Sequence, residues 1–227
     1  MFPEKYDIIR VMNIREKGEE IFSWGVAQRT DDAVSAWKNH SRGAAKVAEE
    51  IAKRCGMDAD RAYVSGLLHD IGRYKGPHTG MKHTVDGNNL LMDKGLPEVA
   101  RICLTHSFNP REKVHEISII SLEQDKFLKD YMSKVEFDDY DRLIQLADFM
   151  SGAHGITTIE RRFCSVLWRH GLKNPQEDLL TLYGLKDYFS EKAGVDVYEI
   201  FRDELAESVF RGTPGKYNNQ KSEEEDA

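Results

Sequence analysis

The sequence predicts an all-α protein, built as a single helical bundle with peripheral N- and C-terminal helices. Apolar residues recur at helical spacing along most of the chain, as Trp37, Ala44, Val47, Ala48 and Ile51 do. No segment alternates apolar and polar residues between hairpin turns, so few strands or none are expected. The 227 residues, of which 40% are hydrophobic and 31% charged, suffice for one substantial core with an appendage.

The N-terminal part of the chain is expected to be helical up to a turn near residue 30. Residues 4–27 carry apolar side chains among charges, and Gly18 is expected to divide them into two helical pieces. Asp31 and Asp32 then precede a long apolar pattern over residues 34–55. Because aspartate favours the N-cap position, these two residues are the candidate caps of that helix.

The next helix is bounded by residues that favour helix ends. Gly56 is expected to stop the preceding helix, since glycine accepts the left-handed backbone of a C-terminal cap. Asp58 is the candidate N-cap of the following helix, which is expected to end near Gly72. A turn-rich stretch with Gly76, Pro77 and Gly80 follows. Further helices are expected around residues 84–94, 97–106, 114–132, 139–152, 157–170 and 196–211.

These elements suggest how the chain is organised. We expect an N-terminal helical segment over residues 1–34, a central helical domain over 35–155 and C-terminal helices packed on it over 156–212. Residues 213–227 are polar and end in an acidic run, which predicts a disordered tail. The apolar faces at 4–27 and 196–211 could cap the core or form a homodimer interface, and the sequence leaves both open.

Composition excludes several classes of function. The net charge of −7 argues against an extended nucleic-acid-binding surface, although a metal site can still attract a small phosphorylated substrate locally. No apolar run approaches the roughly 18 residues of a membrane span. The first 20 residues are too highly charged for a signal peptide. The sequence therefore predicts a cytoplasmic protein that does not enter the membrane.

Cysteine usage agrees with a reducing compartment. Cys55, Cys103 and Cys164 are an odd number, lie far apart and form no CxxC pair. This pattern is typical of isolated thiols and not of a disulfide framework. Cys103 and Cys164 lie among apolar residues and are expected to be small core side chains.

The most informative motif is His69-Asp70 within the apolar segment SGLLHDIGR. A charged aspartate in apolar surroundings costs several kcal/mol unless it is paired or binds a cation. In an isolated dipeptide, a structural hydrogen bond between the two side chains would be the better interpretation. This dipeptide is not isolated, because other histidines and another acid lie on separate predicted helices, each near an apolar face.

The full set of candidate ligands is His40, His69, Asp70, His83, His106 and Asp148. Nitrogen and oxygen ligands in this mixture suit divalent transition metals such as Fe, Mn, Co, Ni or Zn better than Ca. Bundled helices can direct such side chains inward from several directions. The sequence therefore predicts a site for one or two divalent transition metals.

The ordered pattern His40, His69-Asp70 and Asp148 resembles the HD superfamily of metal-dependent phosphohydrolases. The string HDIGRY is similar to the HDIG subgroup of that superfamily, and KHTVDGNNLLMDKGLPEVARICLTH resembles a further stretch of the subgroup. The resemblance covers residues 35–155. It implies an all-helical HD domain in which His40, His69, Asp70 and Asp148 bind one metal.

In family members with two intermediate histidines, a second metal is held and the aspartate of the HD pair bridges the two. His83 and His106 fill those places, so the resemblance favours two metals over one. The chain differs from cyclic-dinucleotide phosphodiesterases of the HD-GYP type, because it has no GYP motif and Ser107 follows His106. It is more similar to diadenosine tetraphosphate hydrolases of the HD family.

The implied function is hydrolysis of a phosphoester or phosphoanhydride in a small, nucleotide-like substrate by metal-activated water. Asp70 is the candidate bridging and orienting residue. Arg73 and Lys82 are the candidate phosphate-binding residues, and Arg73 would also offset charge that develops during the reaction. His78 is the candidate donor of a proton to the leaving group.

Other conspicuous side chains are interpreted more simply. Arg161 and Arg162 could contact a polyphosphate, but a charged pair at helical spacing is more often a solvated helix face, and we expect the latter. The aromatic residues Trp24, Trp37, Phe149, Phe163 and Trp168 are expected to belong to the core.

Three kinds of enzyme remain open: a phosphomonoesterase, a phosphodiesterase and a dinucleoside polyphosphate hydrolase. One alternative is a single-metal phosphatase of nucleoside monophosphates, in which His83 or His106 has another role. The other is a non-catalytic signalling module of the HD type, which the complete set of ligand positions disfavours.

Overall fold

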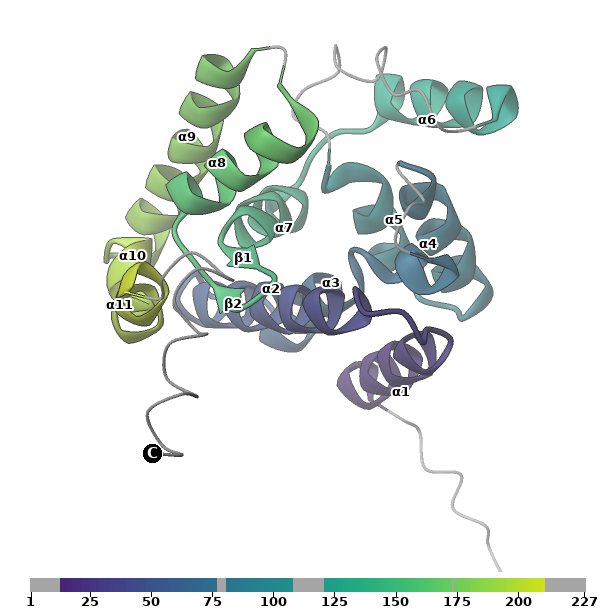
Figure 1. Cartoon of the computed structure of the whole chain (residues 1–227), viewed down its shortest axis with the longest axis horizontal. Coiled ribbons are helices and arrows are strands. Elements are labelled where there is room, and N and C mark those ends of the chain that lie inside the picture. Colours follow the sequence, from purple (N-terminus) through teal and green to yellow (C-terminus); the bar gives the residue numbers. More distant parts are fainter. Residues whose placement is uncertain (1–12, 77–80, 108–120, 173, 211–227) are drawn as a thin grey trace, which may run out of the picture.

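The computed structural model describes residues 13–76, 81–107, 121–172 and 174–210, and these are almost entirely helical (Figure 1). The predicted all-α fold is therefore confirmed. The elements in chain order are α1 (Ile14–Ala27), α2 (Val34–Arg54), α3 (Ala59–Leu68), the 3-10 helix η1 (Ile71–Lys75), α4 (Lys82–Asp93), α5 (Pro97–Thr105), α6 (Leu122–Lys134), α7 (Asp139–Phe149), β1 (Ser151–Gly152), β2 (Gly155–Ile156), α8 (Ile159–His170), α9 (Pro175–Ala193), α10 (Val197–Ile200) and α11 (Arg202–Phe210).

Helix α1 runs without a break through Gly18, so the predicted division of this region at Gly18 is wrong. Gly18 is buried inside the helix, where a Cβ atom would lie 2.8 Å from Cγ1 of Val64 on α3. Its small size therefore permits a close crossing of two helices and does not mark a turn. Residues 4–12 of the predicted helical segment lie outside the described residues.

The helix ends around α2 and α3 are partly as predicted. Gly56 has a φ of 67° just after α2, and the Asp58 side chain accepts a hydrogen bond from the Arg61 amide at the start of α3, so both predictions are confirmed. The prediction that Asp31 or Asp32 caps α2 is wrong. The N-cap is Ala33, and Asp31 instead pairs with the Arg29 guanidinium.

Two predicted helices end earlier than expected. Helix α3 ends at Leu68, and the chain continues through His69 and Asp70 into η1 and not as an α-helix to Gly72. Helix α7 ends at Phe149, after which β1 and β2 form a short antiparallel hairpin. Both early endings place candidate ligands at the end of a helix.

The C-terminal region departs most from the prediction. Helix α9 was not expected from the sequence, and the helix expected over 196–211 is divided into α10 and α11 at Phe201. Val209, which lies in the range 196–211 where an apolar face is predicted, is 60% exposed. Helix α6 starts at Leu122, and the part of its predicted range over 114–120 lies outside the described residues, as does the tail at 213–227.

Helix α7 lies at the centre of the fold. It contacts α2, α3, α5, α8 and α9. Figure 1 shows α4, α5 and α6 on one side of α7 and α8 to α11 on the other. One apolar cluster joins α2 and α7 to the C-terminal helices, and a second joins α1, α2, α3, η1, α4 and α5. The candidate ligands lie on the elements that these clusters hold together.

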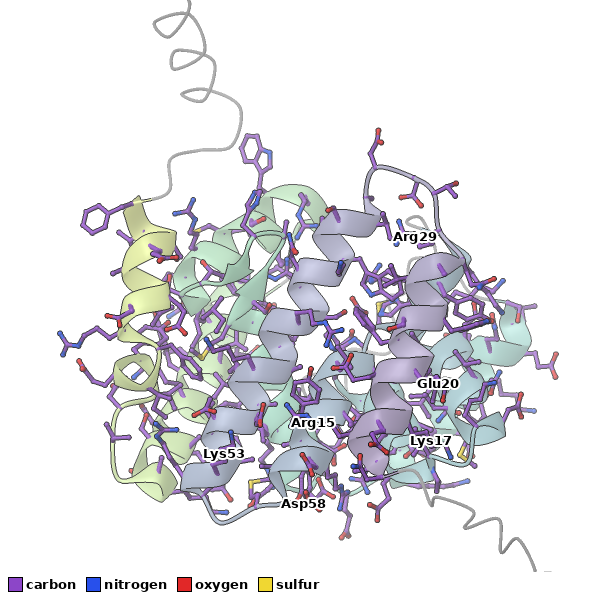
Figure 2. All side chains as sticks on the ribbon, turned by 90° about the horizontal axis from the view of Figure 1, so that it is seen from below. Arg15, Lys17, Glu20, Arg29, Lys53 and Asp58 are labelled. Carbon is purple, nitrogen blue, oxygen red and sulfur yellow. The ribbon has the colours of Figure 1, made fainter. Side chains whose placement is uncertain are left out.

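Polar contacts reinforce the packing of α1. Arg15 lies between α1 and its neighbours α2 and α3 (Figure 2), where its guanidinium pairs with Glu49 and Asp60 and covers the ring of Tyr63 at 3.7 Å. Burial of α1 against α3 and η1 fixes the two elements on either side of His69 and Asp70. Within the described residues, no helix is both long and apolar enough to cross a membrane.

Candidate metal centre

All six candidate ligands converge in the folded chain. His40 comes from α2, His83 from α4 and Asp148 from the last turn of α7. His69 and His106 are the C-cap residues of α3 and α5, and Asp70 follows His69. All but Asp148 are buried, and the Asp148 side chain is only 15% exposed. Residues up to 108 positions apart in the sequence thus share one interior site.

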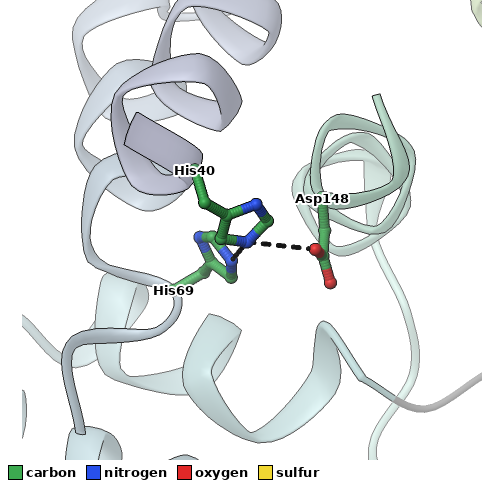
Figure 3. A group of neighbouring side chains, drawn as sticks. All are labelled: His40, His69 and Asp148. Carbon is green, nitrogen blue, oxygen red and sulfur yellow. Dashed lines mark hydrogen bonds and ion pairs between the residues drawn. The ribbon is translucent and has the colours of Figure 1, made fainter. Parts of the chain in front are cut away.

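The first group of ligand atoms consists of His40, His69 and Asp148 (Figure 3). The Nε2 atom of His40 lies 3.1 Å from Nε2 of His69 and 3.2 Å from Oδ1 of Asp148. One potential ligand atom from each residue lies within 4.8 Å of the other two. This spacing lets the three atoms surround one small cation.

A second set of ligand atoms comes from Asp70, His83 and His106, and His69 also lies within ligand distance of Asp70 and His106. Oδ1 of Asp70 lies 3.0 Å from Nε2 of His83 and 3.5 Å from Nε2 of His106, and the two Nε2 atoms are 3.5 Å apart. The other oxygen of Asp70, Oδ2, lies 3.8 Å from Nε2 of His40 and 3.9 Å from Nε2 of His69. The two oxygens of Asp70 therefore face different groups, as a bridging carboxylate would.

The histidine rings are oriented by backbone carbonyl groups. Nδ1 lies 3.1 Å from the Ser151 oxygen in His40, 2.7 Å from the Gly66 oxygen in His69, and 3.1 Å from the Cys103 oxygen in His106. A carbonyl oxygen can only accept, so each Nδ1 carries a proton, and Nε2 is the ring atom that faces the other candidate ligands. Such an outer hydrogen bond commonly fixes metal-ligating histidines.

This tautomer assignment tests whether the residues fit a metal. With Nδ1 of each ring directed at a carbonyl oxygen, Nε2 of His40 and Nε2 of His69 lie 3.1 Å apart and need a proton or a metal cation between them. Oδ1 of Asp70 is buried and accepts no hydrogen bond. The cluster therefore directs lone pairs and carboxylate charge at one small volume, which fits a divalent cation.

Helix ends add to this field. Helices α3 and α5 end at His69 and His106, and α7 ends one residue after Asp148. The C-terminal end of a helix carries partial negative charge and favours a bound cation. The C-terminal ends of three helices and the two carboxylates thus all favour a cation at this place.

The acid and base strengths match ligand chemistry. Burial lowers the pKa of His69 to about 3, which keeps its ring neutral and its lone pair available. Burial alone would raise the pKa of Asp70, but the charges of Arg73 and His83 and the contact with His106 hold it well below the ordinary value. For Asp148, contacts with His40 likewise outweigh burial and lower the pKa. Both aspartates are therefore anionic at neutral pH.

Gly72 shows why the HDIG string ends in glycine. A Cβ atom at Gly72 would collide with the backbone oxygen of His83 and lie 2.7 Å from the amide nitrogen of Gly87, both on α4. The absence of a side chain thus lets η1 lie directly on the backbone of α4. This contact holds His83 beside Asp70.

The predicted substrate residues differ in placement. Nε of Arg73 donates to Oδ2 of Asp70 at 2.6 Å, and the Arg73 side chain is 30% exposed, so this cation borders the cluster and reaches solvent. Lys82 begins α4 with an exposed side chain, and no hydrogen bond or ion pair within the described residues joins it to the cluster. His78 lies outside the described residues.

Three interpretations of other side chains are corrected. Arg162 is not on a solvated face, because its side chain is only 18% exposed and lies 3.5 Å from Oδ1 of Asp148. Trp24 and Trp168 are 40% and 91% exposed and do not belong to the core. Cys164 is exposed, whereas Cys103 is buried as predicted. All three cysteines are free thiols, as expected.

Sequence reasoning missed one residue beside the site, Ser151, and assigned another, Arg162, to a solvated face. Ser151 accepts from His40 through its backbone oxygen, and its hydroxyl donates to the backbone oxygen of His40 at 2.7 Å. Arg162 approaches Asp148 from α8. A serine after a helix and an arginine within a charged helix are both common, so only the fold reveals these roles.

Comparison with known proteins agrees with the ligand pattern. The family model of the HD domain matches residues 37–152, just over half of the chain, and this segment contains all six candidate ligands. Comparisons with curated proteins and with solved structures give no match. On the family match, the chain belongs to the HD-domain superfamily of metal-dependent phosphohydrolases.

Proposed function

We propose that this chain hydrolyses a phosphoester or phosphoanhydride bond in a small, nucleotide-like substrate, with two divalent metals held by the six residues of the cluster. Membership of the HD superfamily supports hydrolysis in general. The observation that carries the specific proposal is the division of the cluster into two ligand groups that share Asp70.

In this proposal His40, His69 and Asp148 hold one metal, His83 and His106 hold the other, and Asp70 contacts both. The mixed nitrogen and oxygen ligands favour Fe, Mn, Co, Ni or Zn. Metals in such a site supply Lewis acidity, which lowers the pKa of a coordinated water and offsets phosphoryl charge.

The chain's own residues would then position and stabilise the reacting groups. Arg73 holds Oδ2 of Asp70 in place and presents donors toward solvent, where a phosphoryl oxygen can accept them. Ser151 fixes the ring of His40, and Gly66 fixes that of His69. We retain Lys82 as a second phosphate contact and His78 as the proton donor to the leaving group, since each is close in sequence to His83.

The experiment is substitution of the two anionic ligands. We expect Asp70→Asn and Asp148→Asn to lose both bound metal and hydrolysis, because an amide is a much weaker ligand than a carboxylate. Metal content is measured by mass spectrometry, and turnover is measured across phosphomonoesters, phosphodiesters and dinucleoside polyphosphates with Mn, Fe(II), Co, Ni or Zn. Asp130→Asn on α6, an exposed position, is the matched control.

The outcomes separate the alternatives. Full activity and normal metal content in Asp70→Asn would overturn the proposal. A wild-type protein that holds one metal, and keeps it in His83→Ala, would indicate the single-metal phosphatase of nucleoside monophosphates. A fully metal-loaded protein without turnover on every substrate class would indicate a non-catalytic signalling module.

A further inference from the structure

Arg162 on α8 is an unusual buried cation. Its side chain is 18% exposed, and its Nε atom is buried without a hydrogen-bond partner. Its one ion pair within the described residues is the contact of 3.5 Å with Oδ1 of Asp148. A guanidinium group has five N–H donors, and leaving them unsatisfied in the interior costs free energy.

Two other arginines, Arg161 and Arg42, are satisfied in a way that Arg162 is not. The adjacent Arg161 donates to the backbone oxygen of Ser208 and thereby attaches α8 to α11. Arg42 makes three contacts, two with the Glu19 carboxylate and one with the Tyr63 hydroxyl. A structural role thus accounts for those two side chains. In Arg162, by contrast, Nη2 has a long contact with Asp148 and Nε is buried without an acceptor.

Arg169 extends this positive charge toward solvent. It lies seven residues after Arg162, hence on the same face of α8 and about 10 Å farther along the helix axis. Its side chain is exposed, and its Nε atom donates to the Ser165 backbone oxygen. Burial and repulsion from Arg162 and Arg73 lower the pKa of Arg169, in agreement with its position on the same face of α8 as Arg162.

The balance of charges near the metal centre also favours binding of an anion beside it. Arg73 and Arg162 each contact one carboxylate of the cluster, and Arg169 pairs with none within the described residues. Bound divalent metals would neutralise Asp70 and Asp148 themselves. The three guanidinium groups would then carry uncompensated positive charge beside the site, which favours an anionic ligand.

We propose that Arg162 and Arg169 form a second anion-binding subsite on α8, which holds a phosphate other than the one at the metal centre. The substrate is therefore a compound with two or more linked phosphates, and not a phosphomonoester. This inference rests on the proposed function, because it takes the metal centre as the site of the scissile phosphate. The subsite lies outside residues 37–152, the segment that matches the HD domain.

The row of cations has the geometry for a chain of phosphates. Asp148 marks the metal centre, Arg162 touches it from within the protein, and Arg169 continues the same helix face to the surface. A single phosphate has its oxygens around one atom and cannot contact both the metal centre and a side chain two helical turns away. Linked phosphates extend in that direction, and bidentate guanidinium contacts suit their oxygens.

The test measures binding and does not depend on turnover. Inorganic orthophosphate and methylenediphosphonate, whose P–C–P bridge resists hydrolysis, are titrated calorimetrically into Mn-loaded wild-type, Arg169→Met and Arg162→Met proteins. We expect the diphosphonate affinity to fall about tenfold to a hundredfold in each variant, as for loss of a charged hydrogen bond. Orthophosphate affinity should change less than about threefold in Arg169→Met, since only screened charge is lost there.

Controls separate the subsite from structural effects. Arg202→Met on α11 removes an exposed arginine and should leave both affinities unchanged. Arg169→Lys should keep part of the preference, because it retains charge but not the bidentate fork. Metal content and melting temperature are measured for every variant. If Arg162→Met loses metal because the contact of Arg162 with Asp148 is removed, the conclusion is drawn from Arg169→Met alone.

The proposal fails if Arg169→Met leaves the ratio of diphosphonate to orthophosphate affinity at the wild-type value. It also fails if both affinities fall equally, because the arginines would then act only on the metal centre. Failure of the proposed function looks different. A protein that prefers diphosphonate through Arg169 but hydrolyses no phosphate compound would retain the subsite and lose the hydrolase assignment.

Discussion

His69 lies fully buried at the end of α3, and its Nδ1 proton points at the Gly66 carbonyl oxygen. In the unfolded chain this side chain titrates near 6.5, whereas burial lowers its pKa to about 3 in the folded protein. Between these two values the unfolded state binds more protons than the folded state. The contribution of His69 to stability is thus complete above pH 6.5 and is lost progressively as the pH falls toward 3.

This loss of stability at low pH leads to a prediction for the metal-free protein. The melting temperature of wild type, measured with chelator, should fall as the pH is lowered from 7 to 4. In His69→Gln the fall should be shallower, because glutamine does not titrate in this range. Parallel curves for the two proteins would show that burial of His69 does not set the pH dependence.

At the scale of single residues, the sequence showed the candidate ligands but not what surrounds them. His40, His69, Asp70 and Asp148 could be chosen because polar residues next to apolar helix faces are unusual enough to require a cation or a partner. For Arg162 the pattern favoured a solvated position over a phosphate contact, because an arginine on a charged helix is usually exposed, and its burial beside Asp148 is seen only in the fold. Burial of one helix face by another depends on the fold.

At the scale of elements, the contact between η1 and α4 is the most sensitive to substitution. Gly72→Ala should destabilise the protein by about 1–3 kcal/mol, as overpacking does, because the new methyl group meets the α4 backbone at His83. Displacement of α4 should also reduce metal content, since His83 moves away from Asp70. Denaturant unfolding and metal analysis check the two effects.

Gly184 offers a control of the same chemistry. It lies on the exposed side of α9, and a Cβ atom there would meet nothing within 4 Å. Gly184→Ala should stabilise the protein by about 0.5–1 kcal/mol, because alanine loses less backbone entropy than glycine in a helix. If Gly72→Ala were as harmless as Gly184→Ala, the close approach of η1 and α4 would not position His83.

A helix could be predicted from the sequence when its apolar residues recur at helical spacing along one face. Helix α2 buries a continuous stripe and was predicted nearly to its ends. Helix α9 was missed because its two buried residues, Leu182 and Phe189, lie two turns apart, whereas Leu180 and Tyr188 are apolar yet exposed. Gly18 led to a wrong prediction because a glycine within a helical pattern usually indicates a helix end. In the fold, its lack of a side chain makes room for Val64.

At the scale of the whole molecule, the C-terminal helices share a core with the helices that carry the ligands. Phe189 of α9 is fully buried in the cluster that contains residues of α2 and α7. Phe189→Ala should therefore cost about 3–5 kcal/mol, as truncation of a buried aromatic residue does. Unfolding followed by circular dichroism should remain a single transition at a lower midpoint, and loss of metal should coincide with it.

Leu180→Ala on the same helix is the matched comparison. Leu180 is 60% exposed, so its truncation should change stability by no more than about 0.5 kcal/mol. Separate transitions for secondary structure and metal loss in Phe189→Ala would mean that α9 folds independently of the metal centre.

The shared core also bears on transfer of this site to another protein. A fragment covering residues 37–152 would carry every candidate ligand, yet it would leave behind Phe163, Phe189 and Phe201, which complete the apolar cluster around α2 and α7. The cut would expose the underside of the helices that bring His40 and Asp148 together. The segment that matches the family is thus shorter than the segment that must be expressed or grafted together for the site to fold.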